Sequence, residues 1–207
     1  MTLIAGAIVE DGVVIRADKR RTTKTSAGGI GHSDDLDKIY VSAAKDTVIY
    51  NHGINRINGR DWRTLASLLD AAFASSSPTD VSDALDTAEN IIGPDACAEI
   101  ATNTIDEMTA FVVLFKDATG QWHAGEVSWH RQEGLKKQKL GRAFWSGSGA
   151  KRYWQPNASQ RTDQHWASVT TDEAQKQLAA LYSDAVARQA QANGTEFSPS
   201  CQDVTIK

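Results

Sequence analysis

The sequence predicts an α+β fold in which two β-sheets carry helices on their outer faces. Three observations lead to this prediction. Two apolar runs rich in β-branched residues, at 2–9 and 13–18, flank Glu10-Asp11-Gly12, which is typical of a tight β-hairpin. Two stretches in the middle of the chain, at 60–74 and 79–92, have apolar residues at helical spacing. A second hairpin and a long helix are expected later, at 109–129 and 170–191.

The segment at residues 19–36 is polar and rich in glycine, which predicts a turn between strands. A phosphate-binding GxGxxG loop would open directly into a helix, whereas the next apolar run has the composition of a strand. We therefore expect strands at about residues 37–43 and 46–52.

The two amphipathic stretches predict helices that cover the same sheet. The first runs from about Arg60 to Ala74, with apolar side chains three and four residues apart. The second has Thr79 or Asp80 as its N-cap. Gly93-Pro94 is expected to interrupt it, because proline removes a backbone donor and clashes with the preceding turn. A continuation is expected from Ala96 to Ile105.

The elements of the C-terminal half are predicted from alternation, turn residues and helix caps. Thr170 or Thr171 is expected to cap the last long helix. In chain order we expect strands at 109–115 and 121–129, a basic loop at 134–139, a strand at 142–146, a short helix or turn at 151–154, an exposed polar connection at 155–168, a helix to about 191 and a closing strand at 203–206.

Composition predicts one folded domain. The chain has 207 residues, of which 41% are hydrophobic and 23% charged, so it is long enough for one large core. No shift in composition divides it, and we expect a single domain over residues 1–207. The net charge of -4 argues weakly against a nucleic-acid partner.

The sequence contains no recognisable targeting or membrane segment. No apolar run approaches the roughly 18 residues that span a bilayer, and the N-terminus lacks a basic segment followed by an apolar one. We therefore expect a cytoplasmic protein without a membrane partner. Cys97 and Cys201 are far apart and lack CxxC spacing, so neither a disulfide framework nor a zinc site is expected. We expect no cofactor.

Thr2 is the first candidate for catalysis. An initiator methionine is normally removed when a small side chain follows it, so Thr2 is expected to begin the mature chain. It would then carry both a hydroxyl nucleophile and a free α-amine. The unperturbed pKa of an α-amine is roughly 7.7 to 8.0, so a useful fraction is neutral near pH 7 and can take the hydroxyl proton. Met-Thr is also a common start for a cytosolic protein, so Thr2 alone decides nothing.

Four further features follow Thr2 in a fixed order: Asp18, Lys38, Gly53 and Gly147-Ser148-Gly149. This order resembles that of the catalytic β-type subunits of the proteasome family, within the N-terminal-nucleophile hydrolases. Among bacterial members the resemblance is closest to the homologue named for the betaproteobacteria and weaker to HslV. It implies a four-layer αββα sandwich, in agreement with the packing expected from the order of elements.

The resemblance implies a role for each of these residues. Thr2 is the nucleophile, Asp18 and Lys38 are the acid and the lysine beside it, Gly53 is the oxyanion-hole glycine, and Ser148 lies near the amine of Thr2. Their chemistry agrees with these roles. A threonine hydroxyl needs a base and a nearby positive charge to become a good nucleophile. Lys38 can supply that charge, and Asp18 can hold the Lys38 ammonium in place. A glycine N–H can donate to the developing oxyanion.

The resemblance also implies substrate-binding residues. Arg20 and Thr22 fall on the positions after the acid. In the family, a set of positions lines the pocket for the substrate residue before the cleaved bond. These positions fall here on Arg21, Leu36, Tyr40, Asn51 and Asn55. Because this lining contains an arginine and two asparagines, we expect it to tolerate acidic or polar side chains.

The sequence departs from the family pattern after the last long helix. Proteasome subunits carry an acid directly after the arginine that corresponds to Arg188, and Gln189 stands there in this chain. That acid and a nearby serine help to order the N-terminal amine. Glu196 and Ser198 are the candidates to replace it, and slow peptidase activity is expected.

We therefore expect a threonine endopeptidase subunit that cleaves polypeptides inside two stacked rings of seven identical chains. The helix near 79–92 and the connection at 155–168 are the expected contact surfaces. No GxxxxGK[ST] loop is present, so any energy-driven unfolding must come from a separate ATP-dependent partner. Two alternatives are open: a proteasome-like ring that acts as a binding assembly with little proteolysis, and an N-terminal-nucleophile amidase for small acyl compounds.

Overall fold

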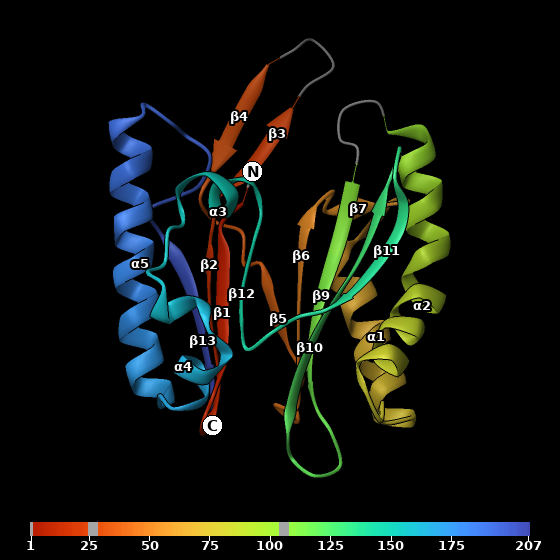
Figure 1. Ribbon diagram of the computed structural model, residues 1–207. Coiled ribbons are helices and arrows are strands. Elements are labelled where there is room, and N and C mark those ends of the chain that lie inside the picture. Colours follow the sequence, from red (N-terminus) through yellow and green to blue (C-terminus); the bar gives the residue numbers. More distant parts are fainter. Residues whose placement is uncertain (1, 25–28, 104–107) are drawn as a thin grey trace. The chain divides into compact units, whose positions relative to one another are not determined.

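The computed structural model describes residues 2–24, 29–103 and 108–207 (Figure 1). These residues form two compact units. The first unit contains the chain up to Lys38 together with residues 141–207, and the second contains residues 39–140. Both units combine an antiparallel sheet with helices, so the predicted α+β class is confirmed. The prediction of a single domain over residues 1–207 stays a prediction.

The sheet of the first unit has four antiparallel strands in the order β12-β1-β2-β13. The predicted N-terminal hairpin forms its centre. Gly12 is required there, because a Cβ at this position would lie 1.9 Å from the carbonyl oxygen of Ile206. The strands are β1 (Ile4–Val9), β2 (Gly12–Asp18), β12 (Ala143–Ser146) and β13 (Cys201–Ile206), with a separate hairpin of β3 (Arg21–Lys24) and β4 (Ile30–Ser33).

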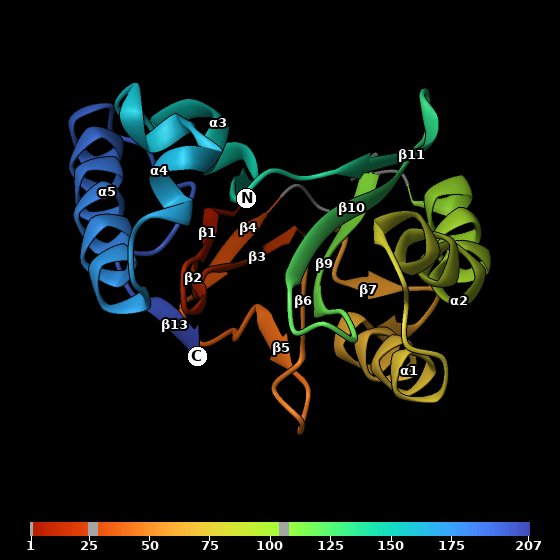
Figure 2. The same ribbon diagram turned by 60° about the horizontal axis from the view of Figure 1, so that its bottom comes forward.

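Helices cover one face of this first sheet, as both ribbon views show (Figures 1 and 2). They are α3 (Ser148–Tyr153), α4 (Asp163–Ala167) and α5 (Thr171–Gln191), preceded by a 3-10 turn at Ser159–Arg161. The side chain of Thr170 accepts a hydrogen bond from the backbone N–H of Glu173, so Thr170 is the N-cap of α5. The core between sheet and helices is built from alternate β1 residues and the inner faces of the helices, including Leu3, Ala5, Ala7, Val9, Trp166, Leu178, Tyr182 and Phe197.

The second unit has a five-stranded antiparallel sheet in the order β11-β10-β9-β6-β5. Two long helices lie against one of its faces (Figure 1). Its strands are β5 (Ile39–Val41), β6 (Thr47–Gly53), β9 (Met108–Lys116), β10 (Trp122–His130) and β11 (Gly134–Lys139), its helices are α1 (Trp62–Ser75) and α2 (Val81–Thr102), and a small hairpin joins β7 (Arg56–Ile57) to β8 (Arg60–Asp61).

Helix α2 differs from the prediction, because it continues through Gly93-Pro94 to Thr102. A proline inside a helix costs about 3 kcal/mol. Ile92, Ala96 and Ile100 are all buried against the sheet, and their burial on both sides of the proline outweighs this cost. Asp80 is the N-cap, as one of the two predicted candidates. The last residues of the predicted continuation lie outside the described ranges.

Strand β11 also differs from the prediction, which gave residues 134–139 as a basic loop. All six of its residues are exposed, so no apolar alternation marks the strand in the sequence. Backbone pairing with β10 forms it, and lysine side chains on its surface pair with neighbouring acids, as Lys137 does with Asp86 (2.5 Å). An edge strand carrying lysines also resists pairing with other chains.

The connection at 155–168 is less exposed than predicted. It contains the 3-10 turn and α4, and Trp166 is buried with its indole N–H donating to the carbonyl oxygen of Gln160 at 2.7 Å. A single tryptophan in a polar segment therefore anchors the connection to the first core. Within the described ranges, every helix is too short or too polar to span a lipid bilayer.

Two neighbouring leucines of α1 test this packing. Leu69 is fully buried in the core of the second unit, whereas Leu68 is 45% exposed. We predict that Leu69→Ala lowers the free energy of unfolding by about 2–5 kcal/mol, because it leaves a cavity. Leu68→Ala, the matched control, should change it by less than about 0.5 kcal/mol. Urea unfolding followed by circular dichroism measures both, and equal losses would contradict the assigned register of the helix.

Candidate active site

Thr2 lies two residues before the start of β1 and is 9% exposed. Its carbonyl oxygen accepts a hydrogen bond of 3.0 Å from the backbone N–H of Gly149. A Cβ at Gly147 would lie 2.2 Å from the same oxygen, and Gly147 has a φ of 93° that favours glycine. The segment Gly147-Ser148-Gly149 thus packs against the backbone of Thr2, which explains why both ends of that segment are glycine.

The ammonium of Lys38 lies between two of the residues predicted to act with it. Its Nζ atom donates to Oγ1 of Thr2 at 3.2 Å and to Oδ1 of Asp18 at 2.8 Å. Both members of the ion pair are buried, with Lys38 3% and Asp18 0% exposed. Thr2, Lys38 and Asp18 are therefore brought together in one unit, although 36 residues separate the first two in sequence.

Asp18 is the last residue of β2, and the strand pairing places it beside the start of β1. Its Oδ1 atom also accepts the backbone N–H of Leu3 at 2.7 Å, and its Oδ2 atom accepts the backbone N–H of Arg20 at 3.0 Å. Three donors therefore fix the carboxylate in one orientation. The ammonium of Lys38 is in turn held in a fixed place beside the Thr2 hydroxyl.

Burial lowers the pKa of Lys38 below its ordinary value of 10.5, because a charged ammonium is costly away from water. The charge and hydrogen bond of Asp18 oppose this effect, while the nearby guanidinium of Arg20 adds to it. A lysine with a lowered pKa exchanges its proton more readily with a neighbouring group at moderate pH.

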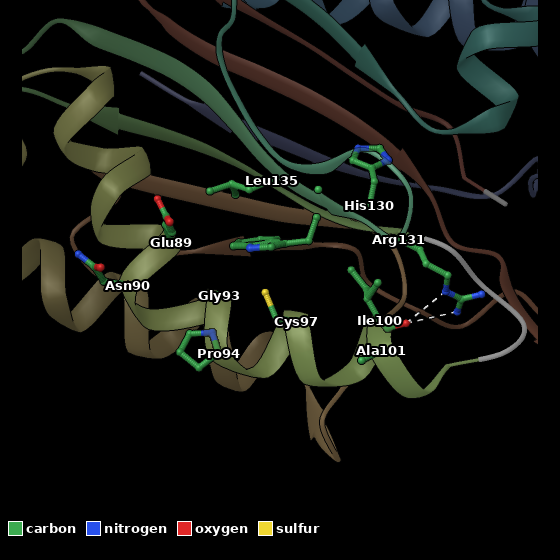
Figure 3. Close-up of a pocket in the computed structure, with 12 residues that line it drawn as sticks. Glu89, Asn90, Gly93, Pro94, Cys97, Ile100, Ala101, His130, Arg131 and Leu135 are labelled. Carbon is green, nitrogen blue, oxygen red and sulfur yellow. Dashed lines mark hydrogen bonds between the residues drawn. The ribbon is translucent and has the colours of Figure 1, made fainter.

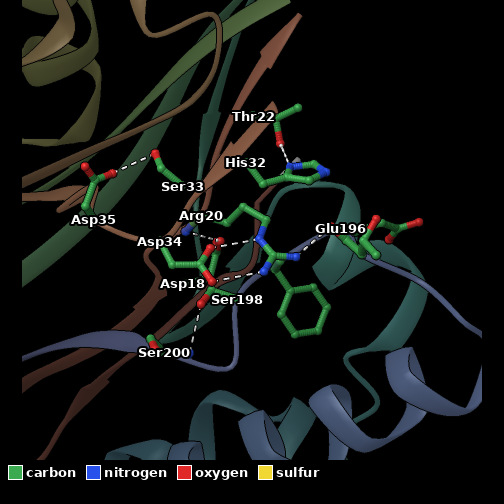
Figure 4. A network of polar contacts seen from close by, with 12 residues as sticks. Asp18, Arg20, Thr22, His32, Ser33, Asp34, Asp35, Glu196, Ser198 and Ser200 are labelled. Atoms are coloured by element: carbon green, nitrogen blue, oxygen red, sulfur yellow. Dashed lines mark hydrogen bonds and ion pairs between the residues drawn. The ribbon is translucent and has the colours of Figure 1, made fainter. Parts of the chain in front are cut away.

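A second group of polar contacts surrounds the three residues (Figure 4). Arg20 donates from Nε and Nη2 to the two oxygens of Asp34, at 2.9 and 3.0 Å, and from Nη1 to the carbonyl oxygen of Thr195 at 3.0 Å. This pairing lowers the pKa of Asp34. Substrate binding by Arg20 stays a prediction. In the structure its guanidinium links the residues after β2 to Asp34 and to the segment before β13.

Gln202 supports the site and was missed by the sequence analysis. Its Oε1 atom accepts the backbone N–H of Lys38 at 2.8 Å, across 164 residues. A half-buried glutamine on the closing strand carries no sequence signal of such a role. Asp34 was missed for a similar reason, because it lies in a short acidic run without a motif.

The roles predicted for Ser148 and Gly53 stay predictions. Ser148 is the first residue of α3 and is exposed. Gly53 ends β6 in the second unit, with a φ of 91°, and a Cβ there would lie 2.4 Å from the carbonyl oxygen of Met108. Its backbone conformation therefore requires glycine whatever its function.

The predicted pocket residues are divided between the units. Arg21 and Leu36 belong to the first unit, where Arg21 is exposed on β3 and Leu36 is half-buried. Thr22, also on β3, has its hydroxyl 3.2 Å from Nδ1 of His32 (Figure 4). In Figure 4 this pair lies on the β3–β4 hairpin, beside the Arg20 contacts.

The other three pocket residues belong to the second unit. The hydroxyl of Tyr40 donates to Asp70 at 2.8 Å. The side-chain amide of Asn51 is buried and donates to the hydroxyl of Thr109 at 3.0 Å. Asn55 is half-buried. The preference for acidic or polar side chains stays a prediction.

The two candidates for the missing acid have partners of their own. Glu196 accepts from Nη1 of Arg152 at 2.7 Å. The hydroxyl oxygen of Ser198 accepts the backbone N–H of Ser200 at 3.0 Å, and a hydrogen bond from Ser198 helps to lower the pKa of Asp34 (Figure 4). Ser198 is therefore joined to the polar contacts around Asp18 through Asp34 and Arg20.

The second unit has a groove of its own, with a volume of about 650 Å³ (Figure 3). It lies between α2 and the strands β10 and β11. Its lining is mostly apolar, and no motif in the sequence indicates it. The residues around it are Glu89, Asn90, Gly93, Pro94, Cys97, Ile100, Ala101, Trp129, His130, Arg131, Gly134 and Leu135.

Comparison with known proteins gives matches among solved structures. No protein-family model matches the sequence, and no curated protein matches it. A structure of an Anbu (Gly-1) mutant from Hyphomicrobium sp. strain MC1 aligns with 100% of this chain and 82% of its own, at 14% identity and a TM-score of 0.62. Anbu, the ancestral beta-subunit, from Yersinia bercovieri aligns with 99% of this chain and 81% of its own, at 13% identity and a TM-score of 0.60.

A third match is the helical assembly of the Anbu complex from Pseudomonas aeruginosa, at 13% identity and a TM-score of 0.60, covering 99% of this chain and 81% of that one. These matches correct the assignment made from the sequence. The structural neighbours are Anbu proteins, which are proteasome-like but distinct. The prediction that the chain most resembles the betaproteobacterial homologue, and less closely HslV, is therefore wrong. The fold of this chain is similar to that of Anbu.

The lowered pKa of Lys38 predicts how stability depends on pH. The buried ammonium carries a free-energy cost that is fully present below its lowered pKa and disappears as the pH rises toward 10.5, because the unfolded chain then also loses the proton. The free energy of unfolding of the wild type should therefore increase relative to that of Lys38→Met as the pH rises above the lowered pKa. Urea unfolding from pH 7 to 10.5 measures this gain.

Lys176→Met is the control, because Lys176 is an exposed lysine on α5. Its stability should follow that of the wild type at every pH. If Lys38→Met also ran parallel to the wild type over the whole range, the lowered pKa would be contradicted.

Proposed function

We propose that this chain is a threonine endopeptidase subunit whose nucleophile is Thr2. The observation that supports the proposal most strongly is the position of the Lys38 ammonium, 3.2 Å from the Thr2 hydroxyl and 2.8 Å from the Asp18 carboxylate. A buried lysine in contact with a hydroxyl is an arrangement that activates a nucleophile. The similarity to Anbu proteins agrees with a proteasome-like relative.

In the proposed reaction, removal of the residue before Thr2 frees its α-amine. The amine takes the hydroxyl proton, Oγ1 forms a bond to the peptide carbonyl carbon, and the carbonyl oxygen becomes an oxyanion. The Lys38 ammonium stabilises negative charge on Oγ1 as the proton leaves. The peptide C–N bond then breaks as the leaving amine takes the proton, and water hydrolyses the resulting ester.

Two other residues complete the proposed site. The backbone N–H of Gly53 would donate to the oxyanion, which is typically worth roughly 3 kcal/mol of barrier. Ser148 would lie near the free amine of Thr2. The polypeptide substrate would be delivered unfolded, with any ATP-dependent unfolding supplied by a separate protein.

We also propose that the two units form one domain with the four-layer αββα arrangement. Burial on both faces of each sheet supports this. In β1, Ala5 and Ala7 belong to the core beneath the helices, and Ile4 on the opposite face is also fully buried. In β9, Phe111 packs toward the helices, and Val112 on the opposite face is fully buried as well. Helices account for only one face of each sheet.

Thr2→Ala tests the proposed nucleophile. The variant should fold like the wild type and lose turnover of a fluorogenic peptide, because it has no hydroxyl to attack the carbonyl. Thr2→Ser is the matched control and should keep measurable turnover, because it retains a hydroxyl in the same place. Intact mass establishes whether Met1 has been removed. Full turnover by processed Thr2→Ala would overturn the assignment.

A binding assembly with little proteolysis is the second candidate. The observation that favours it is Gln189, a neutral residue that stands where the proteasome family has an acid. Complete retention of Met1 in freshly purified protein would support this candidate, because Thr2 would then lack its amine. An amidase for small acyl compounds would instead show itself by hydrolysing acyl amides but not peptides.

Self-association follows from the proposed function, because a closed compartment restricts access to unfolded chains. Head-to-tail contacts between identical chains close into a ring when the rotation per subunit divides the circle, and otherwise give an open helix. The double ring of fourteen chains stays a prediction, and the open helix is the arrangement named for the Pseudomonas aeruginosa Anbu complex. The first half of α2 and residues 155–168 remain the proposed contact surfaces.

We predict an assembly well above a dimer at micromolar concentration. Mass photometry would give a single mass for a closed ring and a ladder of masses for an open helix, and electron microscopy of the same sample would show the symmetry. A monomer or dimer throughout the concentration range would contradict the proposed compartment.

A further inference from the structure

Gln189 makes four hydrogen bonds to the backbone of the segment that follows α5, three through its side chain and one through its backbone carbonyl oxygen. It lies on the last turn of α5 and is 6% exposed. Its Oε1 atom accepts the backbone N–H groups of Glu196 and Phe197, at 2.7 and 2.9 Å, and its Nε2 atom donates to the carbonyl oxygen of Phe197 at 2.9 Å. Its own carbonyl oxygen accepts the N–H of Gly194 at 2.8 Å. The side-chain amide of Gln189 thus holds Glu196 and Phe197, and its backbone carbonyl oxygen holds Gly194.

These residues begin a segment that we name the C-terminal strap, residues 194–202. Phe197 of the strap is fully buried and packs against the Gly-Ser-Gly segment. A Cβ at Gly149 would lie 2.5 Å from the Phe197 ring, so ring and glycine are in direct contact. Gly149 in turn donates its N–H to the carbonyl oxygen of Thr2. One short series of contacts therefore joins Gln189 to the proposed nucleophile.

The strap also reaches the other two residues of the site. The carbonyl oxygen of Thr195 accepts from Arg20, whose backbone N–H binds Asp18 (Figure 4). At the far end of the strap, Gln202 accepts the backbone N–H of Lys38. The relative position of all three residues thus depends on how the strap is held.

We propose that Gln189 is a positioning residue that holds the strap, and through it Thr2, Asp18 and Lys38, in the geometry needed for attack. This inference rests on the proposed peptidase function. The amide matters because it offers an acceptor and a donor to the same backbone segment. An ionised carboxylate of the same size could accept from the two N–H groups but would repel the Phe197 carbonyl oxygen.

Gln189→Glu tests the inference with almost no change in volume. We expect kcat for a peptide substrate to fall by about 100-fold with KM nearly unchanged, the loss typical of a small misplacement of reacting groups. Because a protonated glutamate regains a donor, the ratio of variant to wild-type kcat should rise as the pH is lowered. Gln189→Leu should lose activity without that recovery. Gln191→Glu, at an exposed position two residues further along, is the matched control and should behave like the wild type.

Hydrogen exchange of the Gly149 N–H, read by mass spectrometry, separates this inference from the proposed function. If the wild type turns over peptides and Gln189→Glu matches it, the positioning role is overturned and the function stands. If the wild type has no activity, the function is overturned, and the inference is decided by exchange: faster exchange in Gln189→Glu supports it, and unchanged exchange overturns it. Should Gln189→Glu fail to fold, Gln189→Leu provides the same exchange comparison, because it removes both the acceptor and the donor of the amide.

Discussion

The buried ion pair between Asp18 and Lys38 is the interaction on which the rest of the site depends. Moving two charges out of water costs several kcal/mol for each ion, and their mutual attraction offsets this only when the remaining hydrogen-bonding groups are satisfied. Asp18 meets that condition through the N–H groups of Leu3 and Arg20. A pair of this kind is weak evidence for stability. Its value to the molecule is that it fixes an ammonium beside the Thr2 hydroxyl.

The fold supplies the partners of this pair from distant parts of the chain. The β1–β2 hairpin brings Leu3 and Asp18 together, because the start of the first strand pairs with the end of the second. Lys38 comes from the segment before β5 and is fixed by Gln202 of β13. The hairpin, the lysine and the closing strand must all be in place before the charges are compensated. The site and the core of the first unit are therefore expected to form together.

The features that could be predicted from the sequence are those with signals in residues close together in the chain. The hairpin around Glu10-Asp11-Gly12 and the N-caps Asp80 and Thr170 all have local signals, and each is present. The grouping of Thr2 with Asp18 and Lys38 could be proposed because the resemblance rests on their order in the chain. The same motifs did not indicate the similarity to Anbu, which the comparison of whole folds found.

Other features had no local signal. Strand β11 is exposed along its whole length, so only its pairing with β10 reveals it. The continuation of α2 through Pro94 depends on burial that the sequence does not display. The supports of the site, Gln189 and Gln202, act through single contacts with backbone groups of other segments. No motif marks Gln202, and the neutral residue at position 189 gave no indication of the backbone segment that it holds, so these contacts emerge only from the folded structure.

Labelling with an electrophile tests, without a peptide substrate, whether Lys38 and Asp18 make Thr2 a nucleophile. A β-lactone would be opened by Oγ1 of processed Thr2 to give a stable ester, which peptide mapping by mass spectrometry can locate. We predict one adduct, on Thr2, formed much more slowly in Lys38→Met. Labelling elsewhere in the chain, no labelling of a processed wild type, or an equal rate in Lys38→Met would contradict it.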